Sequence, residues 1–283
     1  LDGMLRQNAV RSWNVMAITF TNKAAGELKE RLAVRLGPAA EDVWASTFHS
    51  ACVRILRRDI DRLGFGKDFT IYDTDDSKRV IRDILKEQNL DEKAFQPRSV
   101  LSVISASKDR YESPEDFAKA HSHEADWKMS RIAKVYAAYA KKLRAANALD
   151  FDDIIYHTVT LLRQEPEVLE YYQHKFRYVL VDEYQDTNHL QYLLTSLLAG
   201  GYKNLCVVGD DDQSIYRFRG ANIENILNFE KQYPNARTIR LEQNYRSTQN
   251  ILDAANAVIR NNTGRKGKTL WTDNGAGDTV TVK

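Results

Sequence analysis

The stretch VLVDEYQDTN, residues 179–188, is an apolar run that ends abruptly in acids and amides. Residues 179–181 are apolar and mostly β-branched, which predicts a buried strand. Asp182 follows directly, so a rigid element fixes its carboxylate, and such a group can hold a hydrated Mg²⁺ shared with substrate phosphates. The adjacent Glu183 points elsewhere and can accept a proton from an attacking water. For these two residues alone, a salt-bridged or capping pair is the competing interpretation.

The composition is that of an ordinary globular protein, with 43% hydrophobic and 28% charged residues among 283, enough for about two domains. No apolar run approaches the roughly 20 residues that span a bilayer, so we expect no membrane contact. The net charge of +2 does not by itself indicate a nucleic-acid-binding protein. Cys52 and Cys206 lie far apart in apolar stretches without metal-ligand spacing, which predicts two buried thiols in a reducing cytosol.

Five short β-rich segments alternate with helical patterns, which predicts a parallel sheet with helices on both faces. The strands are expected at 15–19, 43–46, 178–181, 205–208 and 238–241. The helices that follow them are expected at 23–36, from about 49, at 190–198, 223–233 and 249–261. A strand-to-strand connection needs only a dozen or so residues, yet a charged, mostly helical stretch of about 56–175 separates the second strand from the third. That stretch is predicted to be an inserted helical subdomain.

Each predicted strand ends in polar residues, and ligands of open parallel sheets bind beyond the carboxyl ends of the strands. The five ends read TFTNK, STFHS, VDEYQD, VGDDDQS and LEQNYRS. Gln213 can sense a phosphate or orient a water through its amide, and Arg246 offers a guanidinium fork for a transferring phosphoryl group. Tyr245 offers a face on which a purine can stack. Together with the carboxylates, these side chains predict a site for nucleotide hydrolysis.

Six segments, in this order, resemble successive motifs of the UvrD/PcrA/Rep group of superfamily 1 DNA helicases. They are AITFTNKAAGELKERL, STFHSACVRILRR, LDFDDII, VLVDEYQDTNHLQ, VVGDDDQSIYRFRGA and LEQNYRST. The resemblance covers about residues 13–271 and implies an α/β fold: a RecA-like P-loop NTPase domain with a parallel sheet, plus an inserted, mostly helical subdomain. It implies domain boundaries at 1–55 and 177–242 for the first motor domain, 56–176 for the insert, and 243–283 for the start of a second motor domain.

The resemblance also implies roles for individual residues in a motor that uses ATP and Mg²⁺. Asp182 would hold the magnesium, Glu183 would activate water, Gln213 and Arg246 would sense the γ-phosphate, and Tyr245 would stack on adenine. The residues implied for the DNA track are Phe20, Asn22, Thr47, His49, Tyr216, Phe218 and Arg219. Stacking of bases on aromatic side chains is worth roughly 1–3 kcal/mol per base and tolerates any sequence, which fits this set.

The resemblance implies a monomeric motor that moves 3′ to 5′ along single-stranded DNA and separates the duplex at the junction ahead of it. The resemblance implies a bacterial, cytoplasmic, nucleoid-associated protein with DNA repair or DNA replication proteins as partners. The family often carries tryptophan where this chain has Phe218. Phenylalanine keeps a stacking face but has less area and no indole N–H, so we expect DNA binding at this position to be retained but weaker.

The sequence has no Gly-rich G-x-x-x-x-G-K-[ST] loop to hold phosphates. The GKT at residues 267–269 does not supply one, because Asn262 stands where the first glycine is required. We therefore expect a fragment that lacks the phosphate loop and most of the second motor domain, with little or no helicase activity of its own. Two alternatives remain: the motor part of a helicase-nuclease of the RecB or AddA type, and a nucleotide-independent module that binds single-stranded DNA or another partner.

Overall fold

The computed structural model describes residues 10–122, 126–217, 220–262 and 264–281. The chain divides into two compact units, which are treated separately below. The first contains residues 1–183 and 187–208, and the second contains residues 184–186 and 209–283. The domain boundaries predicted from the sequence stay predictions.

The first unit is built on a parallel sheet of four strands in the order β2-β1-β5-β6. The strands are β1 (Val15–Thr19), β2 (Trp44–Thr47), β5 (Tyr178–Val181) and β6 (Leu205–Val207). The register pairs Ile18 with Val181 and Thr19 with Thr47, so the carboxyl ends of β1, β2 and β5 meet at one edge. Four of the five predicted strands are thus confirmed, and the predicted parallel sheet with them.

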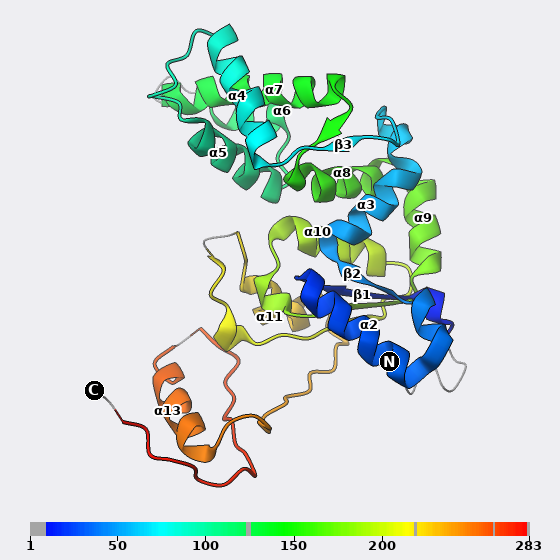
Figure 1. The fold of residues 1–283 in the computed structure, drawn as a ribbon, viewed down its shortest axis with the longest axis vertical. Coiled ribbons are helices and arrows are strands. Elements are labelled where there is room, and N and C mark those ends of the chain that lie inside the picture. Colours follow the sequence, from blue (N-terminus) through cyan, green and yellow to red (C-terminus); the bar gives the residue numbers. More distant parts are fainter. Residues whose placement is uncertain (1–9, 123–125, 218–219, 263, 282–283) are drawn as a thin grey trace. The chain divides into compact units, whose positions relative to one another are not determined.

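Helices cover both faces of this sheet (Figure 1). On one face, α2 (Asn22–Leu36) packs Leu32 against Val15 and Ala45 in a small apolar core. The alternate side chains of β1, including Met16 and Ile18, are also fully buried on the opposite face. Helices α3 (Phe48–Asp59) and α10 (His189–Ala199) lie on that side. Burial on both faces explains why the strands read as continuous apolar runs.

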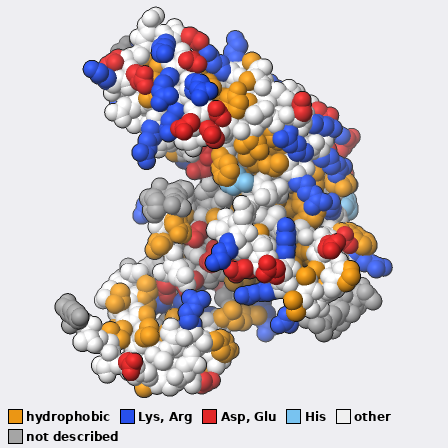
Figure 2. All heavy atoms as spheres, viewed as in Figure 1, with side chains coloured by type: hydrophobic (Ala, Val, Ile, Leu, Met, Phe, Trp, Pro, Cys, Tyr) orange, Lys and Arg blue, Asp and Glu red, His pale blue; other side chains and the backbone are white. Residues whose placement is uncertain are grey.

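The long connection between β2 and β5 is helical, as predicted. Its elements are β3 (Thr70–Ile71), α4 (Thr74–Glu87), α5 (Pro97–Asp109), α6 (Pro114–Ala120), α7 (Trp127–Ala145), β4 (Ala148–Leu149), α8 (Phe151–Gln164) and α9 (Pro166–Lys175). Helices α4 to α7 enclose an apolar core of their own, centred on side chains such as Ile84, Ile104 and Tyr139. Figure 2 shows that basic and acidic side chains are interleaved over these helices on the face in view, as the small net charge suggests.

The described residues of the second unit form the α-helices α11 (Glu224–Leu227), α12 (Phe229–Gln232) and α13 (Gln249–Ile259). The predicted helix at 223–233 is therefore broken into two pieces at Asn228. The predicted strand at 238–241 is wrong: Ile239 and Leu241 are 69% and 78% exposed and belong to no strand. The nearest sheet-like pairing is a single bridge between Gln243 and Trp271.

The two units also contain short 3-10 helices at Ser12–Asn14, Gly37–Asp42, Ile60–Leu63, Tyr184–Asp186 and Asp211–Gln213.

The two thiols differ in burial. Cys52 is buried on α3, as predicted, whereas Cys206 is exposed, so that prediction is wrong. Cys206 lies in β6, the edge strand of the sheet, and the described residues place no strand beyond it. Among the same residues, no helix has both the length and the apolar character needed to cross a membrane.

Candidate functional site

Asp182 and Glu183, the first two acids of the stretch 179–188, lie at the carboxyl edge of the sheet, where β5 ends. The Asp182 backbone N–H donates to the Ile18 carbonyl at 3.0 Å, which extends the pairing of β5 with β1 by one residue. The Glu183 N–H donates to Asp182 Oδ1 at 3.0 Å and so orients that carboxylate. Both residues are exposed at the end of a buried strand. The strand therefore presents a fixed pair of carboxylates to the edge, as the sequence indicates.

Glu183 has an uncommon backbone conformation for a residue with a side chain. Its φ is +50°, in the left-handed region. Such a conformation is disfavoured for residues other than glycine and asparagine, and strained backbone of this kind gathers at functional sites. The chain therefore leaves the extended conformation of β5 at Glu183, directly after Asp182.

The carboxylates fit a magnesium ion in the manner this metal uses with nucleotides. Among the described residues there is no group of three or more histidine, cysteine, aspartate or glutamate side chains that could hold a metal by itself. Mg²⁺ seldom needs such a cage, because it keeps several waters and takes one or two carboxylates together with substrate phosphates. Asp182, oriented and exposed, suits that mode.

An aromatic cluster occupies the same edge, beyond β1 and β2. Phe20, which follows β1, packs edge-on against Phe48 with ring centroids 5.4 Å apart. His49 stacks on Phe151 with centroids 3.8 Å apart and planes inclined by 25°. Phe48 is buried, but the Phe151 side chain remains 58% exposed. The edge therefore presents aromatic faces on which flat groups such as nucleobases can stack.

His49 is held in its uncharged form at neutral pH. Burial lowers its pKa from 6.5 to about 4, because a partly enclosed imidazole loses solvation when it is charged. A neutral imidazole can stack on Phe151 and still donate one hydrogen bond. His49 therefore contributes shape and a hydrogen-bonding group at this edge and no fixed positive charge.

Two other predicted DNA-track residues begin helices. Thr47 is the N-cap of α3, and its Oγ1 accepts from the Ser50 N–H at 3.3 Å. Asn22 is the first residue of α2 and is exposed, while Thr21 caps that helix through a 3.1 Å bond from the Ala24 N–H. Both helices thus start at the edge where β1 and β2 end, and their amino-terminal dipoles favour anions such as phosphate there.

The remaining predicted residues belong to the second unit. Gln213 donates from Nε2 to Asp210 Oδ2 at 2.7 Å. Tyr245 is 79% exposed and donates through its hydroxyl to Gln243 at 2.8 Å. The Arg246 backbone N–H donates to Asn244 Oδ1 at 3.0 Å, so an asparagine turn presents its side chain. Tyr216 is 37% exposed. Phe218 and Arg219 lie outside the described residues.

The loop that carries Gln213 is tied to the basic segment after α13. Arg265 makes a two-pronged bond to Asp212, with Nε–Oδ1 at 2.7 Å and Nη2–Oδ2 at 2.6 Å. Lys268 pairs with Asp210. Burial of Asp210 opposes ionisation, but the bonds from Lys268 and Gln213 outweigh it and lower its pKa. Within this unit Asp210 and Asp212 are therefore paired with cations, and Asp211 accepts a hydrogen bond from the Lys266 backbone N–H at 2.7 Å.

The structure thus brings Asp182, Glu183, Phe20, Asn22, Thr47 and His49 to one edge of the first unit. Sequence reasoning missed Phe151 as a member of that group. Its segment, LDFDDII, was recognised as a motif, but nothing local in the sequence shows that Phe151 stacks on a residue about a hundred positions away. The sequence offers one local signal, an aromatic residue directly after an aspartate, a residue type that favours helix N-caps.

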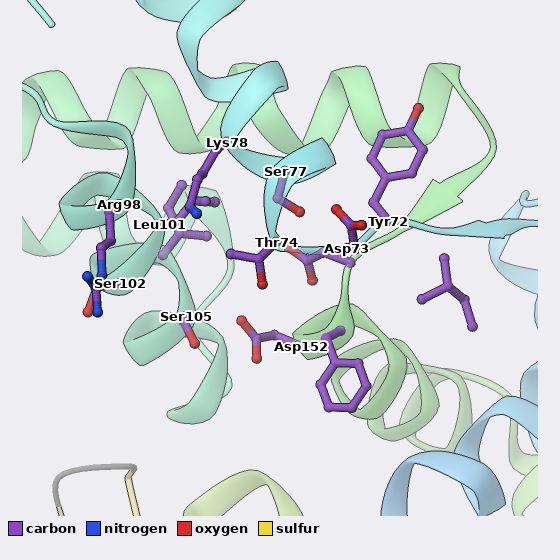
Figure 3. A pocket seen from close by; sticks show the side chains of 14 residues that line it. Tyr72, Asp73, Thr74, Ser77, Lys78, Arg98, Leu101, Ser102, Ser105 and Asp152 are labelled. Carbon is purple, nitrogen blue, oxygen red and sulfur yellow. The ribbon is translucent and has the colours of Figure 1, made fainter.

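Phe151 also lines a cavity of about 550 Å³ in the inserted helices. Figure 3 shows side chains from α4, α5 and the start of α8 around it, with Ser105 and Asp152 close together on the side where α5 meets α8. The cavity wall therefore includes the first turn of the helix that carries the exposed aromatic ring.

Comparison with known proteins agrees with this geometry. Residues 3–234 match the family described as the UvrD/REP helicase N-terminal domain, and residues 239–283 match the UvrD-like helicase C-terminal domain. A Bacillus subtilis protein named ATP-dependent DNA helicase PcrA is 58% identical over 274 residues, covering 97% of this chain and 37% of that protein. A Staphylococcus aureus protein of the same name is 55% identical over 277 residues, covering 98% of this chain and 38% of its own length. The chain thus spans little more than a third of the curated relatives it matches.

Proposed function

We propose, from the premise that this chain belongs to the UvrD/REP helicase family, that it forms part of the motor of an ATP-dependent DNA helicase. One observation carries the proposal: a single edge of a parallel sheet bears both a carboxylate pair after β5 and the half-buried rings of Phe20 and His49 after β1 and β2, with the exposed ring of Phe151 stacked on His49. The first suits a magnesium nucleotide and the second suits a single strand of DNA. Their common support on one rigid sheet suits a machine that couples hydrolysis to movement.

At the nucleotide, each side chain has a distinct task. ATP and Mg²⁺ would supply the phosphoryl group and the charge that neutralises it. Asp182 would hold the metal, and Glu183, whose backbone is left-handed, would take the proton of the attacking water. Gln213 and Arg246 of the second unit would contact the γ-phosphate, and the exposed ring of Tyr245 would stack on adenine.

At the DNA, Phe20 and the His49–Phe151 pair would stack on bases, and Asn22 and Thr47 would contact phosphates at two helix starts. Tyr216, Phe218 and Arg219 would extend this track. The proposed substrate is single-stranded DNA with its junctions to duplex, and the proposed direction of travel is 3′ to 5′. A monomeric state and service in DNA repair or DNA replication are part of the same proposal.

The chain by itself should turn over ATP slowly, because its 283 residues include no Gly-rich phosphate loop. Binding of single-stranded DNA has no such requirement. The first test is therefore a titration of this chain with a fluorescent oligo-dT and with a duplex of equal length. We expect tighter binding of the single strand, falling steeply as salt rises because phosphate contacts release counterions. Absence of single-strand binding at low salt would refute the proposed function.

A further inference from the structure

Lys108, in the last turn of α5, is a buried cation that fixes the start of α8. Its side chain is 4% exposed, and its Nζ lies 2.7 Å from Asp150 Oδ2 and 2.7 Å from Asp153 Oδ1. Burial alone would lower the pKa of Lys108, but the two carboxylates raise it well above the usual value. A buried charge of this kind is held rigidly, because moving either partner leaves the other uncompensated.

The acids that Lys108 holds are the ones that begin α8. Asp150 is the N-cap, and Asp150 and Asp153 exchange bonds to each other's backbone N–H groups at 2.8 and 3.2 Å. Tyr139 of α7 donates to Asp150 at 2.9 Å. Phe151 directly follows Asp150 as the first residue of α8 and carries the ring that stacks on His49. The aromatic stack, defined as His49 and Phe151, is therefore anchored through Asp150 to the end of α5.

The next residue of α5 makes a second connection, in a different direction. Asp109 accepts a 2.6 Å hydrogen bond from Asn188 Nδ2. Asn188 is the N-cap of α10, and its Oδ1 accepts from the Gln191 N–H at 2.8 Å. It is 9% exposed. Asp182 and Glu183, called the carboxylate turn below, lie a few residues before Asn188 in the chain. By holding Asn188, Asp109 therefore helps to fix the segment that follows the carboxylate turn.

We propose that Lys108 and Asp109 couple the aromatic stack to the carboxylate turn, with Asp109 as the positioning residue that acts through Asn188. The inference rests on the proposed function, because the coupling operates only if single-stranded DNA binds at the aromatic stack. A base that stacks on Phe151 shifts or stiffens the first turn of α8. The buried ion pair passes that change to the end of α5, and the Asp109–Asn188 bond passes it to α10 and the turn. Packed side chains and hydrogen bonds can carry such coupling, and the two bonds on this path, Lys108–Asp150 and Asp109–Asn188, are buried and partly buried.

The test is hydrogen exchange of this chain, followed in the peptide that spans residues 182–191, with and without saturating oligo-dT. In the natural sequence we expect the oligonucleotide to slow exchange in that peptide. Asp109→Ala should abolish most of that slowing while oligo-dT affinity changes by no more than about twofold. Asp109→Asn should retain it, because the amide oxygen still accepts from Asn188. Asp83→Ala is the matched control, since it makes the same side-chain replacement at an exposed position of α4.

The outcomes separate the inference from the proposed function. If oligo-dT binds and leaves exchange at 182–191 unchanged, or if Asp109→Ala keeps the full effect, the coupling is refuted and the DNA-binding function stands. If oligo-dT does not bind, both fail. Should Asp109→Ala fold poorly, Asn188→Ala removes the same bond from the other side. It must then lose the slowing as well, and retention of the slowing in that variant overturns the inference.

Discussion

Phe151 stacks on His49 with ring centroids 3.8 Å apart, although the two residues lie on different helices and about a hundred positions apart in the sequence. His49 is the second residue of α3 and lies close to the carboxyl end of β2. Phe151 is the first residue of α8 in the inserted region. The inserted helices therefore contribute a side chain directly to the edge of the sheet that bears the candidate site.

Replacement of Phe151 by alanine should weaken binding of single-stranded DNA by about 1–3 kcal/mol, the range for loss of one base–aromatic stack. The ring is 58% exposed, so stability should change little. Fluorescence anisotropy with oligo-dT measures the affinity. Trp127→Ala is the control: this ring is 62% exposed on α7 and packs against Phe95, away from the stack's partners. Equal effects of the two substitutions would argue against a strand-binding role for Phe151.

Replacement of Glu183 by glycine should leave the protein as stable as before or raise its free energy of unfolding by up to about 1 kcal/mol, because glycine relieves the left-handed backbone. Urea unfolding measures this. Glu30→Gly, within α2, provides the contrast and should cost about 1 kcal/mol as a glycine in a helix interior. A clear loss of stability in Glu183→Gly would mean that the side chain stabilises the fold and that the turn is not strained.

Replacement of Lys108 by methionine should lower the free energy of unfolding by about 3–5 kcal/mol, because it leaves Asp150 and Asp153 buried without their cation. Lys142→Met removes a solvent-exposed pair with Glu87, at 2.6 Å, and should cost about 0–1 kcal/mol. Chemical denaturation of the two variants compares these losses directly. Similar small losses in both would show that the buried pair contributes nothing beyond a surface pair.

The pH dependence of stability should change when Asp109 is replaced by asparagine. Burial, followed by the charge of Asp152, raises the pKa of Asp109 from 3.8 to about 7. The native state therefore holds a proton there between about pH 4 and about pH 7 that the unfolded chain has released, so stability falls as pH rises through that window. Asp109→Asn removes this fall.

Urea unfolding of the natural chain and of Asp109→Asn at about pH 5 and about pH 8 measures the difference. The natural chain should lose stability relative to the variant at the higher pH. Asp153, whose pKa is also raised to about 7 by burial, titrates in both proteins and cancels in the comparison. A constant difference between the two proteins across this range would contradict the raised pKa.

Much of the fold could be predicted because the strands of a covered parallel sheet are continuous apolar runs. The predicted ranges 15–19 and 178–181 match β1 and β5 residue for residue, and the insert is helical as expected. The segment 238–241 has the same strand-like composition, but strand propensity takes effect only where a partner strand is available, and here it finds none among the described residues. Cys206 was placed in the core for a similar reason, since the sequence does not show which strand forms the edge.

The candidate site was predictable where it depends on strand ends, as with Asp182, Glu183, Phe20 and His49. The long-range contacts were not. Lys108 lies in a charged, polar stretch that reads as solvent-exposed, and only the fold places it between two carboxylates of α8. The hydrogen bond between Asp109 and Asn188 was unpredictable for the same reason. The packing of helices sets the distance between these residues, and their spacing along the chain does not indicate it.

The most direct test of the central claim is a crystal structure of a protein that contains this segment together with a phosphate-binding loop, in complex with Mg²⁺ and a non-hydrolysable ATP analogue. The account predicts that the Asp182 carboxylate joins the magnesium coordination shell, directly or through one water. It also predicts that the Glu183 carboxylate lies within hydrogen-bond distance of the water that faces the terminal phosphate. A magnesium nucleotide bound with both carboxylates turned away from the metal and that water would contradict it.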